Sequence, residues 1–173
     1  MSVNRPFSVF LMLALFLSGN ASAYDVLVSV TGKIIGNTCV VSADSKEVNV
    51  PLGTIGTRQF LAAGDVSNIK TPFALNLEEC GPTFAGAKVR FTGTPDTTNT
   101  QLLKVDDGGA TGVAVELLDS NSKLIPLDTQ TEAYGTAGSE TVEMKFFARL
   151  TATGETVTPG DVSAIATWLV EYQ

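Results

Sequence analysis

The chain has 173 residues, of which 11 are basic and 18 acidic, with no histidine and two cysteines, so its formal net charge is −7. The acidic balance argues against a nucleic-acid or anionic-membrane partner, because neutralising phosphates needs clustered lysine and arginine. Without histidine no Ser-His or Cys-His nucleophile pair can be built, and two cysteines alone do not complete a tetrahedral metal site.

The first 23 residues are predicted to be a secretory signal peptide. Arg5 precedes an apolar run from Phe7 to Leu17, and Ala21-Ser22-Ala23 forms an A-x-A cleavage site. The apolar run is too short to span a bilayer, which argues against the alternative of a membrane anchor. Cleavage would leave 150 residues (173 − 23), enough for one domain with a sizeable core, and a net charge of −8 after loss of Arg5.

A regular alternation follows in the stretch "YDVLVSVTGKIIGNTC", residues 24–39. One face carries an almost purely aliphatic series, Val26, Val28, Val30, Gly32 and Ile34. This pattern predicts a strand with one buried face, placed ahead of the first cysteine.

Two cysteines in an exported chain predict one disulfide, between Cys39 and Cys80. Two free thiols would be unusual in an oxidising compartment. With about 40 residues enclosed, the chain-entropy estimate gives on the order of 4 kcal/mol of stabilisation.

Beyond Cys39 the apolar period is almost always two, and no helix longer than a turn or two is predicted. Apolar residues alternate with polar ones at Phe73–Leu77, Val89–Phe91, Val113–Leu117 and Val142–Leu150. Turn clusters such as "GTPDTTN", "DSNSK" and "TPGD" separate these runs. Closely spaced strands with such turns indicate one antiparallel β-sandwich domain, with a barrel as the alternative.

The last predicted strand runs from Val162 to Gln173. One face would carry Val162, Ala164, Ala166, Trp168, Val170 and Tyr172. Natural proteins usually protect apolar edge strands with lysine, proline or charge, but this stretch has neither lysine nor proline. The strand is therefore predicted to leave an unprotected edge.

No catalytic site is predicted, and no cofactor, metal or small-molecule substrate. "DDGGATG", residues 106–112, reads as a turn between strands, because no helix follows it and EF-hand spacing is absent. Glu78-Glu79 and Asp106-Asp107 could be offered as a glycosidase pair. Neighbours on a strand point to opposite faces, so Glu78 and Glu79 are not expected to converge.

Several motifs, in order, resemble the chaperone–usher pilin family, particularly the minor, adaptor-like subunits of type 1 fimbriae. They are Gly32 seven residues before Cys39, the second cysteine in "EECGP", the segments "KVRFTG", "LIPL" and "FFARLTATGETVTPG", and the ending "EYQ". The resemblance covers essentially the whole chain after residue 23. It implies a structural fimbrial subunit, exported through the periplasm to the cell surface.

The resemblance also implies a specific architecture. Residues 37–173 would form an immunoglobulin-like sandwich that lacks its last strand, and residues 24–36 an N-terminal donor strand. A periplasmic chaperone would fill the resulting groove first, an outer-membrane usher would receive the subunit, and the donor strand of a neighbouring subunit would then replace the chaperone.

Roles follow for individual residues. Val26, Val28, Val30 and Ile34 would fill a neighbour's core, with Gly32 where only a backbone can pass; a β-bulge is the alternative account of Gly32. The final strand, Val162 to Gln173, would contact the chaperone, with basic chaperone residues holding its terminal carboxylate.

Two other functions stay open at this point. A stand-alone secreted lectin-like binding domain is the alternative from a different class, and a self-complete sandwich would keep residues 24–36 in its own sheet. Within the family, a major shaft subunit or a terminator is the alternative to a minor tip or adaptor subunit.

Overall fold

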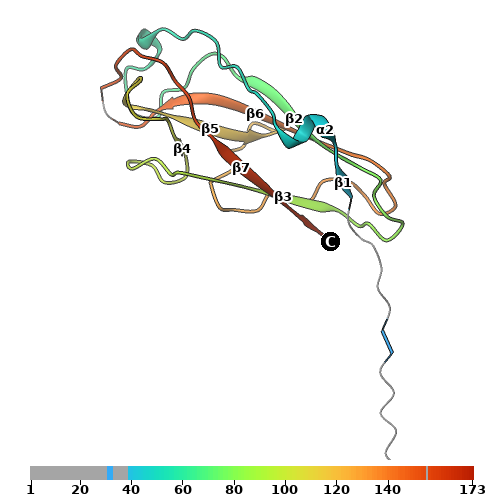
Figure 1. Ribbon diagram of the computed structural model, residues 1–173. Helices are drawn as coiled ribbons and strands as arrows, with labels where there is room; N and C mark the ends of the chain where they lie inside the picture. The colour runs from blue at the N-terminus through green and yellow to red at the C-terminus, as the bar shows by residue number, and fades with distance from the viewer. Residues whose placement is uncertain (1–30, 33–38, 155) are drawn as a thin grey trace, which may run out of the picture. The chain divides into compact units, whose positions relative to one another are not determined.

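The computed structural model describes residues 31–32, 39–154 and 156–173 (Figure 1). The chain divides into two units, residues 1–34 and 35–173. Thr31 and Gly32 are the described part of the first unit, and both are exposed. The predicted signal peptide and the donor residues Val26, Val28, Val30 and Ile34 lie outside the described residues. Within the described residues, no helix is long and apolar enough to cross a membrane.

The regular elements of the second unit are almost all antiparallel strands, as predicted. In chain order its elements are β1 (Val40–Val41), α2 (Ala43–Lys46), the 3-10 turn η2 (Thr57–Gln59), β2 (Thr71–Glu78), β3 (Ala87–Gly93), β4 (Leu103–Lys104), β5 (Val113–Asp119), β6 (Val142–Ala152) and β7 (Ala166–Tyr172). The two helical elements have four and three residues, so the expectation of no long helix is confirmed for the described residues.

The strands form two sheets, a sandwich rather than one closed barrel. The larger sheet has the order β1-β2-β6-β5-β4, and the smaller pairs β3 with β7. Figure 1 shows β3 and β7 running side by side in a layer separate from β5 and β6. The layered arrangement lets the apolar faces of both sheets meet, which is how a sheet of this size excludes water from one face.

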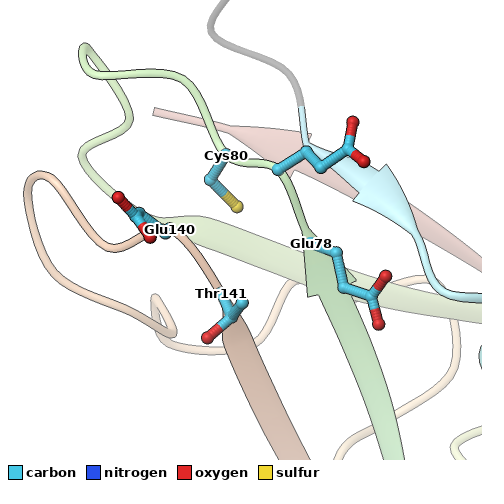
Figure 2. Close-up of a pocket in the computed structure, with 5 residues that line it drawn as sticks. Glu78, Cys80, Glu140 and Thr141 are labelled. Atoms are coloured by element: carbon cyan, nitrogen blue, oxygen red, sulfur yellow. The ribbon is translucent and has the colours of Figure 1, made fainter.

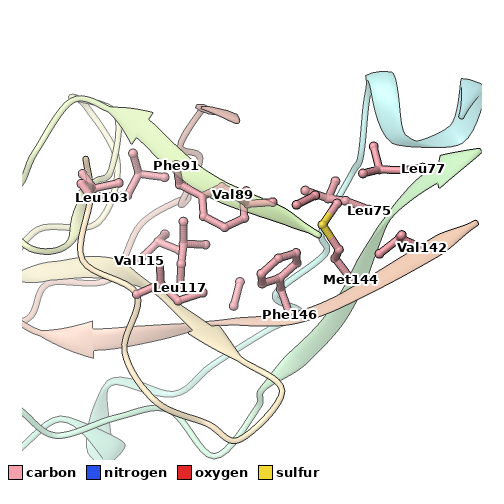
Figure 3. Packing of buried hydrophobic residues seen from close by; sticks show 14 of the residues in the cluster. Leu75, Leu77, Val89, Phe91, Leu103, Val115, Leu117, Val142, Met144 and Phe146 are labelled. Atoms are coloured by element: carbon pink, nitrogen blue, oxygen red, sulfur yellow. The ribbon is translucent and has the colours of Figure 1, made fainter. Parts of the chain in front are cut away.

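The core lies between the sheets and is centred on Phe146 of β6. Its ring contacts Phe91 of β3 edge to face at 5.1 Å, and Phe73 of β2 and Tyr134 lie at 5.5 and 5.4 Å. Figure 3 shows Val89 and Phe91 from β3 facing Met144 and Phe146 from β6. These ring contacts add specific geometry to the burial of large apolar side chains.

A disulfide joins Cys39 and Cys80, the two residues that flank the β1–β2 pair. Val40 pairs with Glu78 beside it, and the Cys80 amide donates to the carbonyl oxygen of Glu140 at 3.0 Å. The short strand β1 is thus tied to the larger sheet by both a covalent bond and a backbone ladder.

The last strand is shorter than the alternation predicted. β7 begins at Ala166, where it pairs with Gly93 at the end of β3, so residues 162–165 lie ahead of the strand. Burial still alternates through 162–172, with even-numbered residues half-buried and odd-numbered ones exposed. The spacing of the apolar residues therefore predicted the half-buried face of residues 162–172 correctly and the first residue of the strand wrongly.

Candidate functional site

β7 is the unpaired edge of the smaller sheet. The far side of β3 is occupied by residues 128–134, whose Thr131 and Tyr134 amides donate to the carbonyl oxygens of Val89 and Ala87, both at 2.8 Å. β7 takes the near side of β3, and among the described residues no strand pairs with the other side of β7. We call this side, over residues 162–172, the open edge.

The backbone groups at the open edge can be assigned from the ladder. The Gln173 amide donates to Gly86, and its carbonyl accepts from Ala85, so Gln173 faces β3. Backbone groups alternate between the two sides along an antiparallel strand. Those of Trp168, Val170 and Tyr172 therefore point away from β3, and no described backbone group bonds to them.

The side chains of the same residues form an apolar face that the domain leaves partly uncovered. Trp168, Val170 and Tyr172 pack against the core but are only half-buried. On β6, by contrast, Met144 and Phe146 on the core-facing side are completely buried. Because these side chains are only half-buried, part of their apolar surface stays in water. Burying that surface would be favourable by about 25 cal/mol per Å².

The partly buried apolar residues come mainly from two stretches. Among those packed on the described core, all except Phe73, Tyr134 and Val157 lie in residues 39–60 or 162–172; the first stretch contributes Cys39, Val41, Val50, Leu52, Ile55 and Phe60. Sequence reasoning missed this first stretch: Val48, Val50 and Leu52 alternate with Asn49 and Pro51, but the alternation is short and the stretch mostly lies outside strands. The core is therefore partly uncovered along these two stretches and well covered elsewhere among the described residues.

Two hydrogen bonds tie these stretches together. The Trp168 indole Nε1–H donates to the carbonyl oxygen of Ser45, and the Tyr172 hydroxyl donates to that of Cys39, both at 3.2 Å. The polar atoms of both aromatic side chains are thus satisfied while their rings remain half-buried. The predicted residues of the final strand lie along one face of the segment 162–172. The donor residues other than Gly32 lie outside the described residues.

A shallow acidic depression beside the disulfide is the other surface feature. Glu78, Glu79, Cys80, Glu140 and Thr141 line it (Figure 2). Both glutamates border the depression; β2 ends at Glu78, and Glu79 has a positive φ of 52°, so it lies beyond the regular strand alternation. Among the described residues no group of acidic side chains has the arrangement to hold a metal ion.

Two titratable groups among the described residues have a shifted pKa. A hydrogen bond from Lys104 to Asp107 and the charge of that carboxylate raise the pKa of the lysine. Burial raises the pKa of Tyr134, and the charge of Asp119 adds to this. Both shifts stabilise the form already present at neutral pH, so neither prepares a proton donor or acceptor for catalysis.

Comparison with known proteins shows the family of this chain. A family model described as "Fimbrial protein" matches residues 28–173. The chain belongs to this fimbrial protein family. The fimbrial chain is 34% identical over 168 residues to the S-fimbrial protein subunit SfaG of Escherichia coli, covering 96% of this chain and 94% of that protein. It is 37% identical to the type-1 fimbrial protein A chain of Salmonella typhi, covering 92% and 93%.

Solved structures agree with the sequence relatives. A type I fimbria protein of Burkholderia pseudomallei superposes with a TM-score of 0.62 at 32% identity, covering 78% of this chain and 89% of that one. The P pilus rod subunit PapA gives 0.66 at 26%, covering 78% and 99%. The fimbrial chain is therefore a structural subunit of a cell-surface fimbria and not an enzyme, as predicted.

Proposed function

We propose that this fimbrial subunit polymerises by donating residues 24–36 to the open edge of the next subunit. The observation that carries the proposal is the coincidence, on residues 162–172, of unpaired backbone groups and a half-buried apolar face. A strand added to a sheet edge gains main-chain hydrogen bonds, while alternate side chains enter the core. The chain offers such a strand in Val26, Val28, Val30, Gly32 and Ile34.

The magnitudes support a durable junction. Burying four aliphatic side chains contributes about 6–12 kcal/mol, at about 1.5–3 kcal/mol each. Backbone hydrogen bonds along the strand add to this, and the entropy of ordering the strand subtracts from it. In this proposal residues 1–23 are removed as signal peptide, residues 24–36 are the donor and residues 37–173 the acceptor domain.

The same edge requires protection before assembly. An exposed apolar edge promotes aggregation, and no lysine or proline lies on residues 162–172. A periplasmic pilus chaperone would occupy Val162, Ala164, Ala166, Trp168, Val170 and Tyr172 and hold the carboxylate of Gln173, and an outer-membrane usher would exchange it for a neighbouring subunit. The chaperone strand and the donor strand would compete for one surface.

Within the fimbria we assign the chain a minor tip or adaptor position, on the motifs "FFARL", "TPG" and "EYQ". Overall identity does not separate the positions, since a relative named as a probable major subunit is 33% identical. Immunogold labelling of assembled fibres distinguishes them: label at the tip supports the assignment, and label along the shaft makes the chain a major subunit.

A graft experiment tests strand donation itself. Residues 37–173 are expressed in the periplasm alone, and again with residues 25–36 linked to Gln173 through a short flexible linker. The graft is expected to convert a marginal or aggregating domain into one that needs several molar more guanidinium to unfold. A graft with Val28 and Val30 replaced by serine is the control and is expected to lose most of that gain. Equal stability with and without the graft would show that the sandwich is already complete.

A further inference from the structure

Two turn sequences that are far apart in the chain lie against each other ahead of β7. The first is "DDGGATG", residues 106–112, and the second is residues 158–163, which contain "TPGD". The Ala110 amide donates to the carbonyl oxygen of Asp161 at 2.9 Å, and the Asp106 amide donates to that of Ser163 at 2.8 Å. The residues 106–112 are therefore bonded to the rest of the domain and are not an isolated turn.

A further backbone hydrogen bond and two side-chain hydrogen bonds reinforce this contact. The Thr158 amide donates to the carbonyl of Thr111 at 3.1 Å, and the two threonine hydroxyls are 2.8 Å apart. The Ser163 hydroxyl donates to the Asp106 carboxylate. We call the contact between residues 106–111 and 158–163 the loop clamp.

The clamp lies on the same side of the final segment as β3. Asp161 and Ser163 are odd-numbered, as is Gln173, whose backbone groups face β3. β3 ends at Gly93, opposite Ala166, and the clamp holds the chain from there back to Asp161. Since burial keeps alternating, Val162 and Ala164 continue the half-buried apolar face of the open edge beyond the end of the sheet.

Two glycines make the close approach possible. A Cβ on Gly109 would lie 2.0 Å from the carbonyl oxygen of Asp161, and one on Gly160 would lie 2.4 Å from the amide nitrogen of Ala110. Both obstacles are backbone atoms, so a side chain cannot be accommodated by a rotamer change. Any residue larger than glycine must separate the two loops.

We propose that the loop clamp is a positioning element for strand donation: Gly109 and Gly160 hold Val162 and Ala164 in line with β7, and so set which donor side chain is accepted at this end of the open edge. The inference rests on the proposed function. It assigns to residues 106–112 a part in subunit recognition, in a region of the chain that lies outside both donor and acceptor strands.

The test uses the full chain after residue 23 with Gly109→Ala. Gly56→Ala is the matched control, because Gly56 has an ordinary negative φ of −78° and a Cβ there would meet no atom within 4 Å. Amide exchange by NMR is followed at Asp106 and Ala110, the two residues of 106–111 whose amides donate to backbone carbonyls of 158–163. Their exchange is expected to accelerate tenfold or more in Gly109→Ala and to stay unchanged in Gly56→Ala.

Recognition is measured with a synthetic peptide of residues 24–36 and its Val26→Ala and Ile34→Ala versions. On the unmodified chain each peptide substitution is expected to weaken binding at least tenfold. On Gly109→Ala, one of the two end substitutions should lose its effect while the other keeps it, since only one donor end lies beside Val162 and Ala164. Equal loss at both ends would mean a general destabilisation and would overturn the positioning role.

Two outcomes distinguish a failure of the positioning role from a failure of strand donation itself. If the unmodified chain binds no peptide, strand donation fails and the positioning role falls with it. If the peptide binds the unmodified chain and Gly109→Ala with the same dependence on Val26 and Ile34, the positioning role alone is wrong. Should Gly109→Ala not fold, the Thr111→Val and Ser163→Ala double variant, which removes only side-chain bonds of the clamp, gives the same readouts.

Discussion

The hydroxyl of Tyr172 donates a hydrogen bond to the carbonyl oxygen of Cys39, 3.2 Å away and 133 residues distant along the chain. One residue ends β7 and the other opens the disulfide-linked segment ahead of β1. Tyr172 also packs its ring edge to face on Phe84, with centroids 6.4 Å apart. The two segments that border the partly uncovered core are thereby joined at one end.

Tyr172→Phe should therefore cost about 0.5–1.5 kcal/mol of unfolding free energy, the usual net value of one hydrogen bond, while leaving the ring packing intact. Denaturant unfolding measures the difference. Tyr134→Phe is the control: its ring contacts Phe146, but no hydrogen bond from its hydroxyl to a described residue is formed. A control loss as large as that of Tyr172→Phe would contradict the assignment.

The Cys39–Cys80 disulfide should supply a larger share of stability. The bond closes a loop with a sequence separation of 41, for which chain entropy gives about 4 kcal/mol. The Cys39→Ser and Cys80→Ser double variant should lose about 2–5 kcal/mol in urea unfolding. Reducing the unmodified protein should give the same loss, and a loss below 1 kcal/mol by either route would show that β1 is held mainly by its backbone ladder.

Alternation predicted the long strands because each has one face on the core. Leu75 and Leu77 of β2, and Met144 and Phe146 of β6, are buried as their period required. Strands β1 and β4 have two residues each, too few for any period to appear. β5 also buries Leu118 on its outer side, where a bridge joins Leu118 to Leu124, and the local sequence pattern does not predict this tertiary contact.

The site was predictable only on its β7 side. The face of Trp168, Val170 and Tyr172 is visible as alternation, and the lack of lysine and proline suggested an open edge. The residues of the stretch 39–60, such as Leu52 and Ile55, were not predicted, because the alternation of Val48, Val50 and Leu52 is short and Ile55 falls outside it. The same holds for the loop clamp, because its glycines are adjacent in space and not in sequence.

The outer face of the larger sheet carries an ion pair that should matter for stability. Arg149 Nε lies 2.6 Å from Glu116 Oε2, with side chains 24% and 12% exposed, and the Thr151 hydroxyl donates to the same carboxylate oxygen at 3.1 Å. Glu116→Ala should cost about 1–3 kcal/mol, because it leaves a largely buried guanidinium without its partner.

A double-mutant cycle with Arg149→Met isolates this pair, and a coupling energy near zero would contradict its importance. The exposed pair Lys145–Glu143 on the same strand is the control, with side chains 64% and 57% exposed. Its disruption by Lys145→Met should change stability by less than about 0.5 kcal/mol, as is usual for solvent-screened pairs.

A substitution at Gly32 can distinguish an effect on fibre assembly from an effect on monomer folding. Gly32 is exposed, and a Cβ built on it meets no atom of the described residues within 4 Å. Gly32→Leu should thus leave the unfolding free energy of the monomer within about 0.5 kcal/mol of the unmodified value, as for other surface changes. If the donor strand passes closely over a neighbour's core at this residue, the same change should reduce fibre assembly at least tenfold.

Thr31→Leu provides the matched control, because neighbouring residues of a strand point to opposite faces and Thr31 would face away from the neighbour's core. Fibre yield by electron microscopy and sedimentation gives the readout for both variants. Normal fibres from Gly32→Leu would place Gly32 outside the donated strand and favour the alternative that it marks a bulge. Normal assembly by Thr31→Leu with loss in Gly32→Leu would instead define the face of residues 24–36 that a neighbouring subunit buries.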